Sequence, residues 1–285
     1  MKEIVIVPAW RRPEMLYATL HRLALADDGA QQYRIVLDRG CSRTTVAVAR
    51  DFAAGMPATV TLRPQHPYRG NSYNVLTAYA QALNEQPDLI YLVEEDVFVA
   101  RDFFTASRAA HMLCPQVLAV SAARNQNLTV AEDPAADPCA LWLHPSYQSL
   151  AVSWRPAQLQ RLLQHAVPPY WGDPVGYCAR TWPASTIPAG HAEQDGLINR
   201  IREHAGLCTA YLATPRAYHA GFYGYNRAGR RLVGGIETVA QRLLTMTAQQ
   251  LNAHACSYPD HTVVDLDAPR PTPCTIRPWP DRVPS

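Results

Sequence analysis

The sequence has almost no lysine, because Lys2 is the only one among its 26 Lys and Arg residues. With 24 acidic residues the formal net charge is only +2, which gives no general reason to expect a nucleic-acid or membrane partner. Arg227, Arg230 and Arg231 form one small basic cluster. A nucleic-acid acceptor therefore stays open but unsupported.

Long hydrophobic runs and paired-cysteine motifs are also missing. No stretch approaches the roughly 18 apolar residues that a membrane helix needs, and the run Ile4–Val7 is too short for the core of a signal peptide. The seven cysteines are odd in number, widely spaced and contain no C-x-x-C. This pattern argues against a disulfide framework or a zinc site and for reduced thiols. We therefore expect a cytoplasmic protein with no membrane span.

Strand-like and helix-like segments alternate along residues 1–122. Such alternation predicts parallel βαβ units with helices on both faces of a sheet, in which ligands bind beyond the carboxyl ends of the strands. Strands are expected near residues 3–8, 33–38, 59–63, 88–93 and 117–121, with helices between them, including 72–84 and 102–112.

The second half of the chain is less regular. Residues 124–147 and 167–190 are expected to be loops, because Pro, Asp, Asn and Gly are scattered through them. Seven prolines from residue 255 onward predict an extended tail. Strands are expected at 148–154 and 207–213, and helices at 156–165, 193–205 and 236–253.

A buried strand is predicted to run directly into three acids, Glu94, Glu95 and Asp96. Three carboxylates at one strand end repel one another unless a cation or hydrogen-bond donors compensate. A divalent ion does this with oxygen ligands and can bridge to a diphosphate. The alternative is a solvated strand end that binds no ligand.

This stretch, together with Asp102–Phe104 just after it, resembles the acidic metal motif of inverting GT-A fold glycosyltransferases, among them N-acetylglucosaminyltransferase I and family 2-like enzymes. The resemblance implies an α/β, Rossmann-like fold: a mixed, mostly parallel sheet flanked by helices, here with a C-terminal helix and a Pro-rich tail. It also implies that Asp96 binds the metal and that Glu94 and Glu95 face the donor. Glu95 departs from the family pattern, which has Asp at the middle position.

Other segments fall where the same resemblance requires donor contacts. The loop after the first strand is expected to grip the nucleotide, and its arginines can pair with a diphosphate. An acid after the second strand is expected to read the uracil ring, although a plain turn acid is the alternative. The segment before the third helix is a looser match to a donor-contacting loop. These candidates are Pro8, Trp10, Arg11, Arg12, Asp38 and Asn74.

Asp195 stands in the first turn of a predicted helix, where the helix dipole favours a carboxylate. Sugar transfer with inversion needs a carboxylate that takes the proton of the acceptor hydroxyl. The segment resembles the acid-Asp motif of the same family, which implies that Asp195 is the general base. Gln194 replaces the acid that often precedes it, and Glu193, one residue further back, is a candidate acceptor contact.

His219 follows a predicted strand, and its order after the acids and the base matches a His that binds the metal or the diphosphate in many GT-A enzymes. A neutral imidazole is a suitable ligand for Mn²⁺. Trp171, in the Pro- and Gly-rich segment, is a candidate acceptor contact because sugar faces stack on aromatic rings. A literal D-x-D, Asp265–Asp267, lies in the tail and is interpreted as a solvated or strand-end pair.

Together these motifs imply a glycosyltransferase that uses Mn²⁺ or Mg²⁺ and moves a hexosyl or N-acetylhexosaminyl group, with inversion, from a nucleotide sugar, such as a UDP-sugar, to a hydroxyl acceptor. The acceptor is a saccharide, a small molecule, a protein or a hydroxylated DNA base. Residues 1–231 would form one domain, with a nucleotide-sugar half (1–122) and an acceptor half (123–231), and residues 232–285 would pack on it.

Two alternatives remain. A sugar-phosphate nucleotidyltransferase has a similar α/β half, but it usually carries a Gly-rich loop after the first strand, where residues 8–13 here contain no glycine. A non-catalytic nucleotide- or sugar-binding protein of the same fold would bind ligand without turnover.

Overall fold

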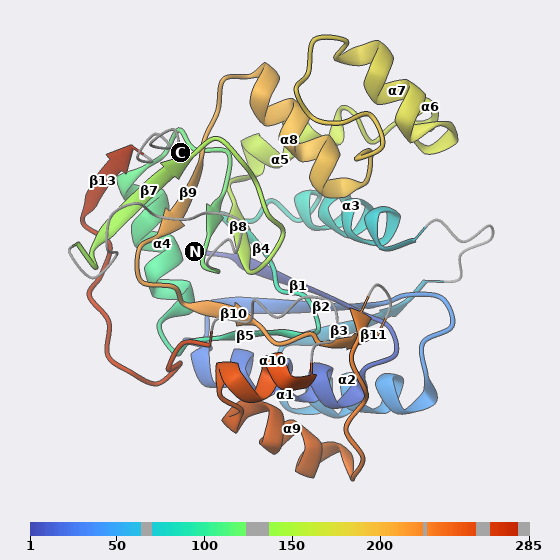
Figure 1. Ribbon diagram of the computed structural model, residues 1–285, viewed down its shortest axis with the longest axis vertical. Helices are drawn as coiled ribbons and strands as arrows, with labels where there is room; N and C mark the ends of the chain where they lie inside the picture. Colours follow the sequence, from blue (N-terminus) through green and yellow to red (C-terminus); the bar gives the residue numbers. More distant parts are fainter. Residues whose placement is uncertain (64–69, 124–136, 225–226, 255–262, 279–285) are drawn as a thin grey trace.

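The computed structural model describes residues 1–63, 70–123, 137–224, 227–254 and 263–278 of the chain, whose centre is a nine-stranded sheet (Figure 1). Five neighbouring strand pairs are parallel, whereas β7–β9, β6–β8 and β4–β8 are antiparallel. The predicted mixed, mostly parallel sheet is thus confirmed. In spatial order the strands are β13 (Thr275–Pro278), β7 (Ala140–His144), β9 (Thr209–Leu212), β6 (Val120–Ser121), β8 (Val152–Trp154), β4 (Leu89–Leu92), β1 (Glu3–Ala9), β2 (Gln31–Leu37) and β3 (Ala58–Leu62).

Helices cover both faces of this sheet. In β1 the side chains alternate, so that Val5 and Val7 enter one apolar core while Ile4 and Ile6 enter the other. The first core is covered by α1 (Pro13–Ala26), α2 (Arg43–Gly55) and α4 (Phe103–Leu113). The second is covered by α3 (Gly70–Leu83), α5 (Pro156–Leu163), α6 (Pro168–Gly172), α7 (Pro174–Thr181) and α8 (Gln194–His204).

Three segments differ from the sequence prediction. Residues 167–190 are not a loop throughout, because α6 and α7 begin at Pro168 and Pro174. Proline is tolerated at the first position of a helix, since the N–H that it lacks would have no partner within the helix. Of the predicted loop at 124–147, residues 140–144 form β7, and 124–136 lie outside the described residues. The predicted helix at 236–253 is two helices, α9 (Ile236–Thr245) and α10 (Ala248–His254), separated by an extended Met246.

The C-terminal segment packs on the rest of the chain. Helix α9 packs on α1, and Leu243 of α9 and Leu251 of α10 share an apolar cluster with Met15. Strand β13 pairs with β7 at the edge of the sheet, so part of the expected tail is a strand. No helix of the described ranges is long and apolar enough to cross a membrane.

A second, two-stranded sheet was not predicted. In it β5 (Val97–Val99) runs antiparallel to β10 (Ala217–His219), and His219 lies opposite Val97. A further short pair joins β11 (Tyr223–Gly224) to β12 (Arg227–Ala228). Because β5 follows the acid triplet directly, this register places His219 beside Asp96.

Candidate active site

The site begins where β1 and its neighbour β4 end, since the residues after the two strands meet there. The Trp10 backbone N–H donates to Glu95 Oε2 (2.9 Å), and Arg12 Nε donates to Glu95 Oε1 (2.8 Å). Both oxygens of Glu95 are therefore engaged by protein donors, and the residue is buried. The resemblance implies that Glu95 faces the donor, and in the structure its two oxygens accept from Trp10 and Arg12.

Asp96 lies at the centre of a buried cation-rich cluster. Its Oδ2 accepts from Arg12 Nη1 (2.5 Å) and lies 3.0 Å from His219 Nε2. Burial alone would raise the pKa of Asp96, but Arg12 and His219 outweigh it and hold the pKa well below the usual range. Gly221 closes the cluster, because a Cβ there would lie 2.0 Å from Asp96 Oδ2 and 2.6 Å from His219 Nε2.

The donor atoms of this cluster fit a divalent cation in part. Asp96 Oδ1 is buried and has no hydrogen-bond partner, which leaves one oxygen ligand unused. His219 Nε2 lies 3.0 Å from the other oxygen, Oδ2, and would be a nitrogen ligand in the tautomer without a hydrogen on Nε2. Within the described ranges no group of three or more His, Cys, Asp and Glu side chains is arranged to hold a metal. The remaining ligands would be diphosphate oxygens and water, as is common for such ions.

Two other carboxyl groups meet at Ser149. Asp195 lies in the first turn of α8, and Ser149 Oγ is 3.3 Å from Asp195 Oδ2 and 3.4 Å from Glu94 Oε1. The loop that carries Ser149 is fixed to α8, because Asn199 accepts from the Tyr147 N–H (2.8 Å) and donates to the Tyr147 carbonyl (3.0 Å). The sequence analysis missed Ser149, since nothing near it in the chain marks it.

Among the described residues neither of these carboxyls forms an ion pair, and the charge of Arg12 only partly opposes the rise in the pKa of Glu94. Desolvation raises the pKa of Asp195 to about 6, against the opposing hydrogen bond from Ser149. Desolvation also raises the pKa of Glu94 to about 8, and the charges of Asp96 and Asp195 add to this shift. At neutral pH Asp195 is mostly a carboxylate and Glu94 is mostly protonated. Because a hydroxyl has one hydrogen, protonated Glu94 can donate to Ser149 while Ser149 donates to Asp195.

Side-chain hydrogen bonds join the loop after β1 to the turn after β2. Arg11 lies 4.5 Å from the centre of the Trp10 ring and donates to the Gly40 carbonyl (2.8 Å), and Trp10 Nε1 donates to the Arg39 carbonyl (2.9 Å). Buried Asp38 accepts from the Arg39 N–H (2.8 Å), as a turn acid does. The loop and turn that hold these donor candidates are thus joined beside the acid cluster.

Two further donor candidates make contacts within the fold. Pro8 is buried in β1. Asn74, also buried, donates to the Val36 carbonyl (3.3 Å) and accepts from Arg63 Nε (3.0 Å), which ties α3 to β2. These contacts explain the presence of Asn74 without a ligand.

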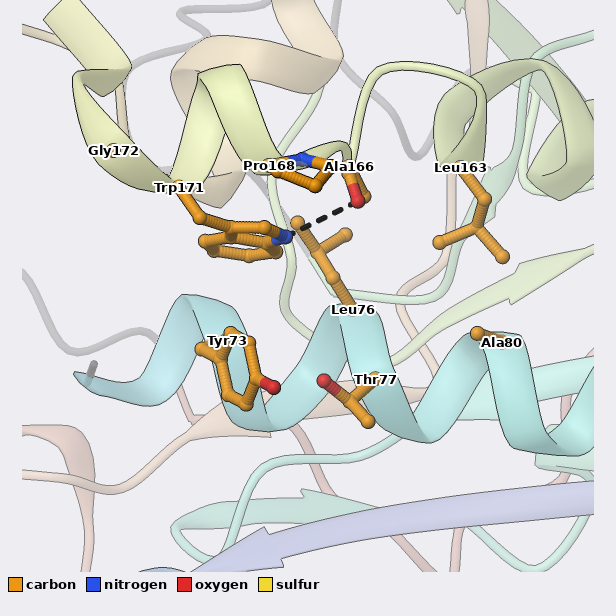
Figure 2. Close-up of a pocket in the computed structure, with 9 residues that line it drawn as sticks. All are labelled: Tyr73, Leu76, Thr77, Ala80, Leu163, Ala166, Pro168, Trp171 and Gly172. Atoms are coloured by element: carbon orange, nitrogen blue, oxygen red, sulfur yellow. Dashed lines mark hydrogen bonds between the residues drawn. The ribbon is translucent and has the colours of Figure 1, made fainter. Parts of the chain in front are cut away.

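The two acceptor candidates lie on different elements. Trp171 lines a cavity of about 570 Å³ between α3 and α6, where Figure 2 shows its ring facing Tyr73 and its Nε1 bonded to the Ala166 carbonyl (3.1 Å). The Trp171 and Tyr73 ring centres are 4.9 Å apart. None of the acid residues lines this cavity. Glu193 is exposed at the head of α8.

The D-x-D of the tail has a structural role. Asp267 accepts from Arg22 (3.1 Å) and from Arg101 (3.0 Å), and it is far from buried, with 57% of its side chain exposed. Asp265 accepts from the Asp267 N–H (3.0 Å). This agrees with the interpretation as a solvated pair.

Comparison with known proteins finds similar structures but no similar sequences. No protein-family model matches the chain, and no curated protein sequence matches it. Among solved structures the chain is similar to the mannosyltransferase PcManGT from Pyrobaculum calidifontis in complex with GDP-Man and Mn²⁺, with 17% identity and a TM-score of 0.48 over 75% of this chain and 57% of that one.

Two further structures have similar chain paths. TarS 1–349 from S. aureus in complex with UDP-GlcNAc is 14% identical, with a TM-score of 0.46 over 91% of this chain and 68% of that one. Glucosyl-3-phosphoglycerate synthase from Mycobacterium tuberculosis, in complex with Mn²⁺, UDP and glucosyl-3-phosphoglycerate, is 13% identical, with a TM-score of 0.43 over 89% of this chain and 80% of that one. The chain spans 57% of PcManGT and 59% of TarS in another of its structures. The solved structures to which this chain is similar include glycosyltransferases. At these identities the likeness is one of chain path, and function is inferred below from the side chains of this chain.

Proposed function

We propose that this protein is an inverting glycosyltransferase that transfers a sugar from a nucleotide sugar to a hydroxyl acceptor. One observation carries the proposal: two sets of carboxyls meet at one end of the sheet, and their environments differ. Asp96 is ionised and surrounded by cationic or metal-ligating groups, whereas Asp195 is ionised without a cation and has a raised pKa of about 6. Paired acids whose pKa values are pushed apart are typical of acid–base sites.

Asp195 is the proposed general base. It accepts the proton of the acceptor hydroxyl as that oxygen attacks the anomeric carbon from the face opposite the diphosphate. The bond between the anomeric carbon and the diphosphate oxygen breaks, and the nucleoside diphosphate leaves with the electron pair. Its pKa of about 6 keeps Asp195 ionised at neutral pH yet basic enough to hold a proton during the reaction.

Residues around Asp96 would bind the leaving group. Arg11 and Arg12 present guanidinium groups that can pair with phosphate oxygens. When bound, Mn²⁺ or Mg²⁺ supplies positive charge that stabilises the departing diphosphate, and Asp96 and His219 are the residues that would hold it. Asp38 can accept from the N–H of a uracil ring, which favours a UDP-sugar donor. Protonated Glu94 can donate to a sugar hydroxyl.

The acceptor half is less defined. Glu193 is exposed at the head of the helix that carries Asp195, which suits a contact to an acceptor. Trp171 would contribute an aromatic surface to an acceptor that extends along α3. We propose that the group transferred is a hexosyl or N-acetylhexosaminyl group. Residues 1–231 would form the transferase domain, with residues 232–285 packed on it.

A thermal-shift panel of UDP, GDP and their sugars, each with and without Mn²⁺, tests the donor site. We expect one nucleotide sugar with Mn²⁺ to raise the melting temperature by roughly 5 °C near 100 times its Kd. Asp96→Asn should lose this shift, and Asp265→Asn, an acid of the tail D-x-D, should keep it. If no nucleotide stabilises the wild type with or without metal, the proposal is wrong.

A further inference from the structure

Arg12 is hydrogen-bonded to one oxygen of Asp96, the proposed metal ligand. We infer that Arg12 opposes divalent-cation binding at Asp96 until an anionic diphosphate is present, so that metal and nucleotide bind together. This inference rests on the proposed function, because it concerns the same donor site.

The contacts of Arg12 are those of a cation held between acids. Its Nε bonds Glu95, its Nη1 bonds Asp96 and lies 3.3 Å from the Tyr223 carbonyl, and only 18% of its side chain is exposed. On the other side Gly224 approaches closely, since a Cβ there would lie 3.1 Å from Arg12 Cδ. Burial by itself lowers the pKa of Arg12, but Asp96 and Glu95 raise it well above its usual value. The guanidinium is therefore permanently charged.

A divalent cation at Asp96 would meet this charge. Oδ1 is the carboxylate oxygen without a partner, and Arg12 is bonded to the other oxygen of the same group. Like charges on the two oxygens of one buried carboxylate repel strongly, because little solvent lies between them. A diphosphate removes this conflict in two ways: it offers Arg12 a bidentate partner, and it gives the cation more oxygen ligands.

Direct metal binding tests the inference without an assay of activity. Electron paramagnetic resonance of free Mn²⁺ gives its Kd for wild type, Arg12→Gln and Arg43→Gln, first without nucleotide and then with UDP. Without nucleotide, Arg12→Gln should bind Mn²⁺ at least about tenfold more tightly than wild type. Arg43→Gln is the matched control, since it removes the same charge from an exposed side chain in the first turn of α2. UDP should then strengthen Mn²⁺ binding less in Arg12→Gln than in wild type.

The outcomes separate this inference from the proposed function. If Arg12→Gln binds Mn²⁺ no more tightly than wild type, while both bind it with UDP, the role of Arg12 is wrong and the donor site stands. If no protein binds Mn²⁺ even with UDP, the metal site itself is wrong. Should Arg12→Gln fail to fold, side-chain ¹⁵N resonances of arginine in the wild type provide the readout. UDP alone should shift the Arg12 Nε signal, and an unchanged signal would contradict the inference.

A second, independent feature is a pair of cysteines at the edge of the sheet formed by β13. Strand β13 pairs with β7 from Thr275 opposite Ala140, so Cys274 and Cys139 are the preceding pair in the same parallel register. The Cys139 carbonyl accepts from the Cys274 N–H (3.0 Å). A hydrogen bond between the two thiols is the largest cause of the raised pKa of Cys139. Cys274 is exposed and Cys139 is partly exposed, so an oxidant can reach both.

We propose that Cys139 and Cys274 form a disulfide under oxidising conditions and thereby fasten β13 to the sheet. Neighbouring strands lie about 4.8 Å apart, within the roughly 4.4–6.8 Å that separates the Cα atoms of disulfide-bonded cysteines. With oxidised glutathione as the oxidant, both thiols lose their protons and together two electrons, a sulfur–sulfur bond forms, and the glutathione disulfide is reduced to two thiols. The new bond links distant parts of the chain and so restricts the unfolded state.

Free-thiol counting and peptide mapping test this pair. Treatment of the native protein with oxidised glutathione should lower the number of free thiols by two and yield a peptide in which Cys139 is joined to Cys274. The melting temperature should rise by several degrees and return to its first value on reduction. Cys274→Ser should show neither change, and Cys178→Ser, at a buried cysteine outside the pair, should still lose two thiols and show the same reversible rise. An unchanged number of free thiols after treatment, or a disulfide between other cysteines, would contradict the proposal.

Discussion

Two groups of carboxyls sit side by side at the end of the sheet, and they are compensated in opposite ways. Glu95 and Asp96 bond to Arg12, and Asp96 also bonds to His219. Glu94 and Asp195 share only the hydroxyl of Ser149. Residues 94 and 95, consecutive in the chain, thus face different environments.

The difference shows how one short acidic segment can serve two chemical roles. A carboxylate paired with a buried guanidinium stays ionised and suits a site for positive charge and anionic ligands. A carboxyl that is desolvated without a cation has a raised pKa and suits proton transfer near neutral pH. Each prediction below tests one side of this contrast.

The largest expected effect is on the side that lacks cations. Asp195→Asn removes the base and keeps the shape of the side chain, so the rate of transfer should fall about 10³-fold. Stabilisation by donor and Mn²⁺ should persist, because the cluster around Asp96 is intact. The measurement is single-turnover transfer with the donor that the thermal-shift panel identifies. Glu237→Gln, at an exposed acid in the first turn of α9, is the matched control and should keep the rate. Full activity of Asp195→Asn would remove the base assignment.

Glu94 gives a smaller effect, on stability, that depends on pH. Its pKa is about 8 in the folded protein against an ordinary 4.5, so the folded state keeps a proton that the unfolded state has lost between these values. The contribution of protonated Glu94 to the free energy of unfolding is therefore fully present below pH 4.5 and declines as the pH rises toward 8. Glu94→Gln removes the decline, so its melting temperature relative to wild type should increase from pH 5 to pH 8, by about 6 °C for a change of about 3 kcal/mol.

A control distinguishes this effect from the effect of removing one negative charge anywhere on the protein. Glu193→Gln makes the same chemical change at an exposed acid of the neighbouring helix, and its melting temperature should run parallel to that of wild type over the same pH range. A Glu94→Gln curve that also runs parallel to wild type would show that Glu94 is ionised in the folded protein, and the contrast between the two acid groups would then fail.

Sequence patterns predicted the elements that carry this site better than the contacts that define it. Asp96 and Asp195 were placed after a buried strand and at the head of a helix because both features are local in the chain. The bond from Arg12 to Asp96 joins residues 84 positions apart, and that from His219 to Asp96 joins residues 123 apart. Such pairings depend on which strands become neighbours, here β1 with β4 and β5 with β10. Local patterns do not contain that information.

Proline misled the prediction for a related reason. Its frequency at 167–190 predicts a loop, although Pro168 and Pro174 occupy the first positions of helices. Proline restricts the backbone both in a loop and at the start of a helix. Here the packing of Tyr170 and Cys178 into the core distinguishes the helices from a loop. Ser149 is the clearest example of what local patterns leave out. Nothing in the sequence around this loop serine indicates that it contacts Glu94 and Asp195.

Ser149 also supplies the smallest and most specific test of the comparison. Its hydrogen bond lowers the pKa of Asp195 against the rise that desolvation causes. Ser149→Ala should therefore raise the pKa of the base and move the acidic limb of kcat/KM to higher pH, by about half a unit for the loss of about 0.7 kcal/mol. Ser72→Ala is the matched control, because Ser72 Oγ accepts from the Gln194 N–H of the same helix (3.1 Å). It perturbs the helix end but leaves the bond to Asp195 in place. A shift with Ser149→Ala alone would identify the titrating base as the carboxyl at Ser149, whereas equal profiles would place that base elsewhere.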